Sequence, residues 1–133
     1  MAIQLTRGAL GAMVCAATLA LSPLPAAAHH GWGGNVDQVS EMTGMVVEGV
    51  KLAGPHGTMK INVDGHVWDL TLAPPFRTSS AGLKPDTIPV GAMVIVRGQK
   101  NRDASRYEMK TIQVEYEGRH FTVYPEREAS LKH

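Results

Sequence analysis

Cysteine is almost missing from this 133-residue sequence, which contains only Cys15. Cys15 lies in an N-terminal apolar segment that we expect to be removed on export, so the mature chain is predicted to contain none. Disulfides, thiolate metal sites and a cysteine nucleophile are thereby excluded from the mature protein. Its stability must come from a packed core, and any metal must be bound by nitrogen, oxygen or thioether donors.

An excess of charge of either sign is also missing. The sequence has 13 Lys and Arg residues against 12 Asp and Glu residues, and Arg7 is the one charged residue in the first 28 positions. A balanced chain has no bulk electrostatic attraction to nucleic acid or to anionic lipid. We therefore expect no nucleic-acid partner.

Catalytic motifs are absent as well. The sequence has no G-x-S-x-G turn, no phosphate-binding loop and no H-E-x-x-H pair, and its carboxylates occur singly at turn and solvent positions. This pattern favours a non-enzymatic binding protein.

Residues 1–28 have the three parts of an export signal. Arg7 is the early cation, an apolar stretch runs from Ala9 to Leu21, and two prolines precede Ala26-Ala27-Ala28. Small residues at this place fit the subsites of signal peptidase, and the apolar stretch is shorter than the roughly 20 residues that a membrane-spanning helix needs. The signal predicts cleavage after Ala28 and a periplasmic or secreted protein that does not span the membrane.

The mature chain contains short segments rich in strand-forming residues, separated by turn residues. Asp64-Gly65 joins two alternating runs and favours positive φ, so it predicts a β-hairpin. Glu117-Gly118 predicts a second hairpin in the same way. The expected strands cover residues 42–52, 58–63, 66–72, 91–98, 106–116 and 119–125.

One longer connector, residues 73–90, interrupts the strands. Pro74 and Pro75 end the third strand, and Thr78, Ser79 or Ser80 is expected to cap a short helical turn that ends near Gly82.

Three strands, a helical connector and further strands follow each other in the order of an OB-fold, a Greek-key barrel. We predict one mainly β domain of this kind, with an open β-sandwich as the alternative. The predicted divisions are an N-terminal arm (29–41), the barrel (42–125) and a polar, frayed tail (126–133).

Cleavage after Ala28 would make His29 the first residue of the mature protein. Its α-amine and Nδ1 can chelate one metal ion, and a third nitrogen from His30 or a distant imidazole would complete a site suited to Cu(II). Cleavage after Ala27 would instead give a mature chain that begins Ala28-His29-His30, with a histidine at the third position. At this spacing the terminal amine, two deprotonated amides and the imidazole bind copper or nickel in a square plane. The alternative interpretation is that the two histidines only keep the terminus solvated.

His56 lies in a glycine- and proline-containing loop between the first two strands. In an OB-like barrel this loop borders the usual ligand-binding face. His56 is therefore the histidine best placed to join His29 and His30, and the alternative is an ordinary polar turn residue. His66 and His120 open strands and are expected to be exposed cross-strand partners.

Tryptophan, arginine and methionine offer further candidates. Trp32, between glycines, is expected to pin the arm to the barrel or to stack on a sugar or base. Trp68 has the spacing of a core residue, and Arg77 is a candidate anion ligand. Five methionines could ligate Cu(I): Met42, Met45, Met59, Met93 and Met109. Met59, Met93 and Met109 have the spacing of core residues, which favours a packing role for these three.

An ordered set of motifs across residues 29–127 resembles a family of small exported bacterial proteins of unknown function. The resemblance implies a periplasmic β-barrel with no assigned activity and no catalytic residues. Members commonly have Asn before the Pro-His-Gly, where this chain has Gly54. The motifs are His29-His30-Gly31-Trp32, Thr43-Gly44, Pro55-His56-Gly57, LAPPFR (72–77), Gly82-Leu83, VGAMVIVRG (90–98) and YPER (124–127).

Two functional hypotheses follow from these residues. The first is a periplasmic binding protein that holds a transition metal, with copper preferred, through His29, His30 and His56. The second is an OB-like module that binds a small molecule, a glycan or a protein partner around Trp32, Trp68 and Arg77.

Overall fold

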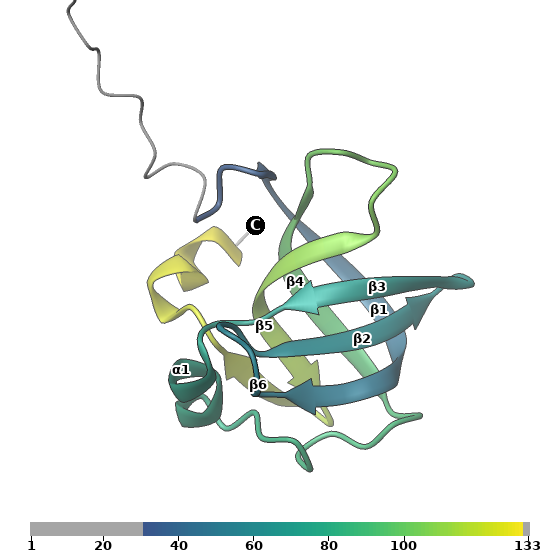
Figure 1. Cartoon of the computed structure of the whole chain (residues 1–133), viewed down its shortest axis with the longest axis vertical. Helices are drawn as coiled ribbons and strands as arrows, with labels where there is room; N and C mark the ends of the chain where they lie inside the picture. The colour runs from purple at the N-terminus through teal and green to yellow at the C-terminus, as the bar shows by residue number, and fades with distance from the viewer. Residues whose placement is uncertain (1–30, 132–133) are drawn as a thin grey trace, which may run out of the picture.

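The computed structural model describes residues 31–131, and His29 and His30 lie outside this range. Six strands form one sheet, with a short α-helix between the third and fourth strands (Figure 1). The elements are β1 (Asn35–Lys51), β2 (Thr58–Val63), β3 (His66–Thr71), α1 (Pro75–Ser80), β4 (Met93–Asn101), β5 (Glu108–Tyr116), β6 (Arg119–Thr122) and the 3-10 helix η2 (Pro125–Leu131).

The sheet closes on itself to form a barrel. The strand order is β3-β2-β1-β4-β5-β6, and β3 also pairs in parallel with β5, where Leu70 lies opposite Met109. The ring β1-β2-β3-β5-β4, with a helix between β3 and β4, is the OB-fold arrangement. The predicted barrel is confirmed, and the open sandwich is wrong because β3 and β5 pair.

Two glycines allow strands to approach closely in this barrel. A Cβ atom at Gly98 would lie 2.2 Å from the Lys110 carbonyl oxygen, and one at Gly44 would lie 2.6 Å from the Asn62 carbonyl oxygen. Gly98 also follows a register shift between β4 and β5. Glycine without a side chain is required here for strands to bend and close.

Both predicted hairpins are confirmed. Asp64 and Gly65 have φ of 50° and 85°, and Glu117 and Gly118 have φ of 50° and 75°. Two consecutive residues with positive φ match the twist of the flanking antiparallel strands.

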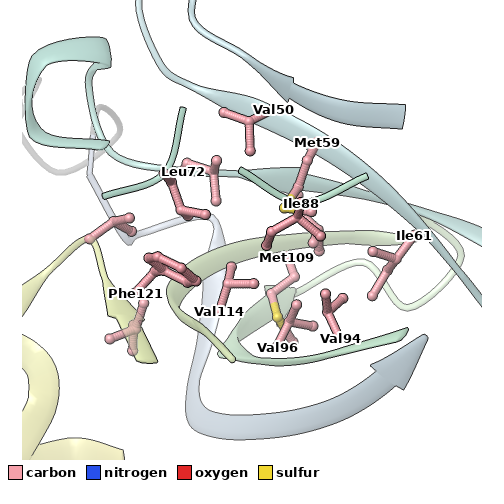
Figure 2. Close-up of a cluster of buried hydrophobic side chains, with 14 of the residues drawn as sticks. Val50, Met59, Ile61, Leu72, Ile88, Val94, Val96, Met109, Val114 and Phe121 are labelled. Atoms are coloured by element: carbon pink, nitrogen blue, oxygen red, sulfur yellow. The ribbon is translucent and has the colours of Figure 1, made fainter. Parts of the chain in front are cut away.

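The barrel interior is filled by aliphatic residues and methionines from all its strands (Figure 2). Met59 and Met109 are buried as expected, but Met93 is 58% exposed, so its predicted core position is wrong. On β4, Val94 and Val96 point inward, and the strand alternation turns Met93 outward. Trp68 is half-buried against the core rather than inside it.

Some predicted boundaries differ from the observed ones. β1 begins at Asn35, so much of the predicted arm (29–41) is strand, and it pairs with β4. Most of the predicted frayed tail forms η2.

The helix α1 also differs from its prediction at its start. It begins at Pro75 after Pro74 with no side-chain cap, and Thr78 lies buried inside it, where its hydroxyl donates to the Ala73 carbonyl (2.7 Å). The predicted caps at Thr78, Ser79 or Ser80 are therefore wrong. The helix ends before Gly82, which has a φ of 97°, as expected.

Candidate functional site

A hollow of about 300 Å³ lies beside His56, between the β1–β2 loop and the start of β5. The β1–β2 and β4–β5 loops border the ligand-binding face of OB-folds. Gly31, the residue directly after His30, lines the same hollow as His56. The full lining is Gly31, Gly34, Asn35, His56, Thr71, Asn101, Glu108, Met109 and Lys110.

Backbone hydrogen bonds fix the position of His56. The next residue, Gly57, donates its N–H to the Ala73 carbonyl and accepts from the Leu72 N–H, both at 2.8 Å. Gly57 is buried against Thr78 of α1, and His56 itself is half-buried. The imidazole therefore sits on a clamped loop and not on a free one.

Trp32 attaches the N-terminal segment to the barrel, as predicted. Its ring meets the Tyr124 ring edge-on with centroids 5.0 Å apart. The Lys110 ammonium lies 4.7 Å and the Arg127 guanidinium 3.9 Å from the Trp32 ring centroid. Aromatic pairing and cation–π attraction both stabilise this arrangement.

Lys110 connects this cluster to the hollow. Its ammonium donates a 3.0 Å hydrogen bond to the Gly31 carbonyl and also lies 5.7 Å from the Tyr124 ring centroid. Burial, with a smaller contribution from the nearby Arg127, lowers the pKa of Lys110 from its usual 10.5. The hollow thus contains a cation that is partly withdrawn from water.

The carboxylate in the hollow is already engaged. Glu108 accepts from the Asn101 amide (2.8 Å) through Oε2 and from the Arg106 guanidinium (2.9 Å) through Oε1. Both oxygens are committed to donors, so a metal ion would have to compete for them.

Residues 31–131 hold no group of three or more His, Cys, Asp or Glu side chains placed to bind one metal ion. Two other histidines, which we expected to be exposed at strand ends, are indeed exposed. His66 stacks on Tyr107, with ring centroids 4.4 Å apart, and His120 Nε2 lies 3.3 Å from Glu115. Neither lines the hollow beside His56.

Trp32, Trp68 and Arg77 do not share one surface. Arg77 donates to Glu126 (2.6 Å), and its guanidinium lies 5.1 Å from the Tyr124 ring centroid, on the side of the barrel where α1 and η2 lie (Figure 1). Trp68 lines a different hollow together with His66 and Tyr107. Of the three residues in the second hypothesis, only Trp68 lines this hollow. Trp32 and Arg77 instead make contacts within the protein, with Tyr124 and with residues of η2.

Sequence reasoning missed Lys100, Tyr107 and Lys110 as lining residues. Lys110 alternates with the buried Met109 and Thr111, and a lysine in such a strand is a usable signal of a partly buried cation. Tyr107 precedes β5 in a polar loop, and nothing in that local pattern indicates that it packs on β3.

No helix within residues 31–131 is long and apolar enough to cross a membrane.

In comparisons with known proteins, no family model matches this chain, and no curated protein matches it. Among solved structures, it is similar to the ZRD-deleted mutant of TiaS in complex with agmatine, with a TM-score of 0.48 and 12% identity. The match covers 66% of this chain but 27% of that one, and at this level it carries no functional argument. The resemblance to the exported family stays a prediction.

Proposed function

We propose that this protein is an exported, non-enzymatic metal-binding protein, with copper as the preferred ion. The ligands are the terminal amine and imidazole of His29, together with His30 and His56. One observation supports this most: Gly31, adjacent to His30 in the chain, lines the same hollow as His56.

The anchoring of the chain strengthens the case. Lys110 binds the Gly31 carbonyl, and Trp32 is packed between Tyr124, Lys110 and Arg127. These contacts hold the residues directly after His30 at the edge of the hollow. A short, fixed link between His30 and the barrel lowers the entropy cost of bringing the terminal ligands to His56.

The donor set determines the metal. Amine and imidazole nitrogens bind Cu(II) more tightly than Ni(II) or Zn(II), following the Irving–Williams order. Because Glu108 is engaged by Asn101 and Arg106, the set consists of nitrogen donors. Lys110 is a nearby cation that works against binding, so the chelate at the terminus must supply most of the affinity.

Copper titration of histidine variants tests this proposal. The mature protein, starting at His29 and free of any N-terminal tag, is compared with His56→Ala, with His120→Ala and with a free peptide of its N-terminal residues. His120 is an exposed histidine that does not line the hollow, which makes it the matched control.

The proposal predicts about tenfold or more weaker binding by His56→Ala and unchanged binding by His120→Ala. Equal affinity of the wild type, His56→Ala and the free peptide would mean that the folded domain contributes no ligand. The proposal would then be abandoned.

A further inference from the structure

A second hollow, of about 570 Å³, lies on the other side of the β4–β5 connection from His56. Lys100 and Tyr107 line it, whereas the next residues, Asn101 and Glu108, line the hollow beside His56. Its volume is within the range of small-molecule sites. Its charged and aromatic lining residues are Glu41, Asp64, His66, Trp68, Lys100 and Tyr107.

Three aromatic rings form one wall of this hollow. Tyr107 stacks on His66 at 4.4 Å with an interplanar angle of 27°, and meets Trp68 at 5.3 Å and 71°. Tyr107 is 40% exposed and Trp68 is half-buried, so the wall is open to solvent. The Tyr107 carbonyl accepts a 2.9 Å hydrogen bond from the Asp69 N–H, which ties the loop to β3. The rings are therefore held in place before any ligand arrives.

The charges around the rings indicate what kind of ligand fits. The Lys100 ammonium lies 5.1 Å from the Trp68 ring centroid, so the place for a cation above that ring is already filled. Glu41 and Asp64 stand at the rim, and Glu41 accepts a 2.7 Å hydrogen bond from Arg97. An anion would meet these two carboxylates, and a second cation would meet Lys100. A neutral polar ligand suits the site best.

We infer that this hollow binds a neutral oligosaccharide whose pyranose rings carry equatorial hydroxyls, as cello- and chito-oligosaccharides do. The flat C–H face of such a ring packs on an aromatic wall, and its hydroxyls both donate and accept hydrogen bonds. Glu41 and Asp64 offer acceptors, while Lys100 and the Tyr107 hydroxyl offer donors. OB-fold barrels use this region for oligosaccharides, which is an analogy at the level of the fold. The inference does not depend on the metal proposal.

Tryptophan fluorescence offers a direct test, because Trp32 and Trp68 are the two tryptophans of the chain. In a Trp32→Phe background, Trp68 alone reports binding. This protein is titrated with cellotetraose and with chitotetraose. We expect a saturable change in Trp68 emission with at least one of them, and about tenfold or more weaker binding in Tyr107→Ala.

Two variants control the experiment. Phe76→Ala removes an aromatic ring that is 84% exposed and outside this hollow, and should leave sugar affinity unchanged. Asp64→Asn keeps the turn, since Asn tolerates the positive φ of Asp64, but removes a carboxylate acceptor, so affinity should fall about threefold or more.

The absence of a saturable response to both sugars would overturn the inference, as would unchanged affinity in both Tyr107→Ala and Asp64→Asn. A metal chelator and the His56→Ala variant should leave sugar binding intact, so failure of one proposal is separable from failure of the other.

Discussion

The Lys110 ammonium donates a 3.0 Å hydrogen bond to the Gly31 carbonyl, joining the start of β5 to the first described residue of the chain. The two residues are 79 positions apart. This contact, with Trp32 packed directly after it, fixes Gly31 on the barrel. Gly31 lines the hollow that contains His56.

Trp32 should be a major attachment of the N-terminal segment. Trp32→Ala removes the edge-on contact with Tyr124 and both cation–π contacts. We expect the free energy of unfolding to fall by about 2 kcal/mol, since the ring is only half-buried. Urea denaturation followed by circular dichroism measures this. Phe76→Ala, which removes an exposed ring, should change stability by less than about 0.5 kcal/mol; equal effects of the two variants would contradict the anchoring role.

Gly98 should tolerate no side chain. In Gly98→Ala the new Cβ would lie 2.2 Å from the Lys110 carbonyl oxygen, so β4 and β5 would have to separate. We expect a loss of about 3 kcal/mol in the free energy of unfolding. Gly34→Ala is the matched control, because a Cβ atom there meets nothing within 4 Å. Thermal unfolding compares the two, and a Gly98→Ala protein as stable as Gly34→Ala would refute the close approach.

Ionised Glu115 should stabilise the folded protein, and this contribution to the free energy of unfolding should be lost at acid pH. The hydrogen bond from Arg97 (2.8 Å) is the main cause that lowers the pKa of Glu115 below its usual 4.5. The unfolded chain therefore takes up a proton at a higher pH than the folded one. The stabilisation is fully present above about pH 4.5 and is lost as the pH falls through the lower folded pKa.

Glu115→Gln removes this contribution. The difference in the free energy of unfolding between the wild type and this variant should shrink as the pH falls from 6 to 3. Asp37→Asn is the control, because within residues 31–131 Asp37 forms no ion pair. A pH-independent difference for Glu115→Gln would show that its ion pair does not stabilise the fold.

Copper affinity should depend on protonation of the donors. Amine and imidazole nitrogens must be deprotonated to bind, so affinity should fall as the pH is lowered through about 6.5. Acetylation of the His29 amine should weaken binding further, because it removes one arm of the chelate. Competition titrations with a copper indicator between pH 5.5 and 8 measure both effects. Binding that is insensitive to acetylation would rule out the terminal amine as a ligand.

The sequence predicts the barrel well because its signals are local. Asp64-Gly65 and Glu117-Gly118 determine their turns by backbone preference alone, and the strand alternation of Met59 and Ile61 places both inside. The run from Met93 to Val96 is apolar at every position, so the sequence does not show that Val94 and Val96 face the core while Met93 faces solvent.

The side-chain contacts around the two hollows are predicted less well from the sequence than the barrel is. The glycines that flank Trp32 indicate that its ring attaches the N-terminal segment to the barrel. They do not reveal its partners Tyr124 and Arg127, which are about ninety residues away in sequence. The wall formed by His66, Trp68 and Tyr107 arises from the parallel pairing of β3 with β5. Such contacts depend on which strands pair when the barrel closes, and a single sequence does not reveal this pairing.

In the proposed function, the folded domain supplies His56 to a copper ion held by the N-terminus. Pulsed electron paramagnetic resonance counts the imidazoles on Cu(II), and it can be applied to the mature wild type, His56→Ala and His120→Ala at one equivalent of copper. We predict that His56→Ala loses one imidazole from the wild-type spectrum while His120→Ala loses none. Identical spectra for the wild type and His56→Ala would show that His56 is not a copper ligand.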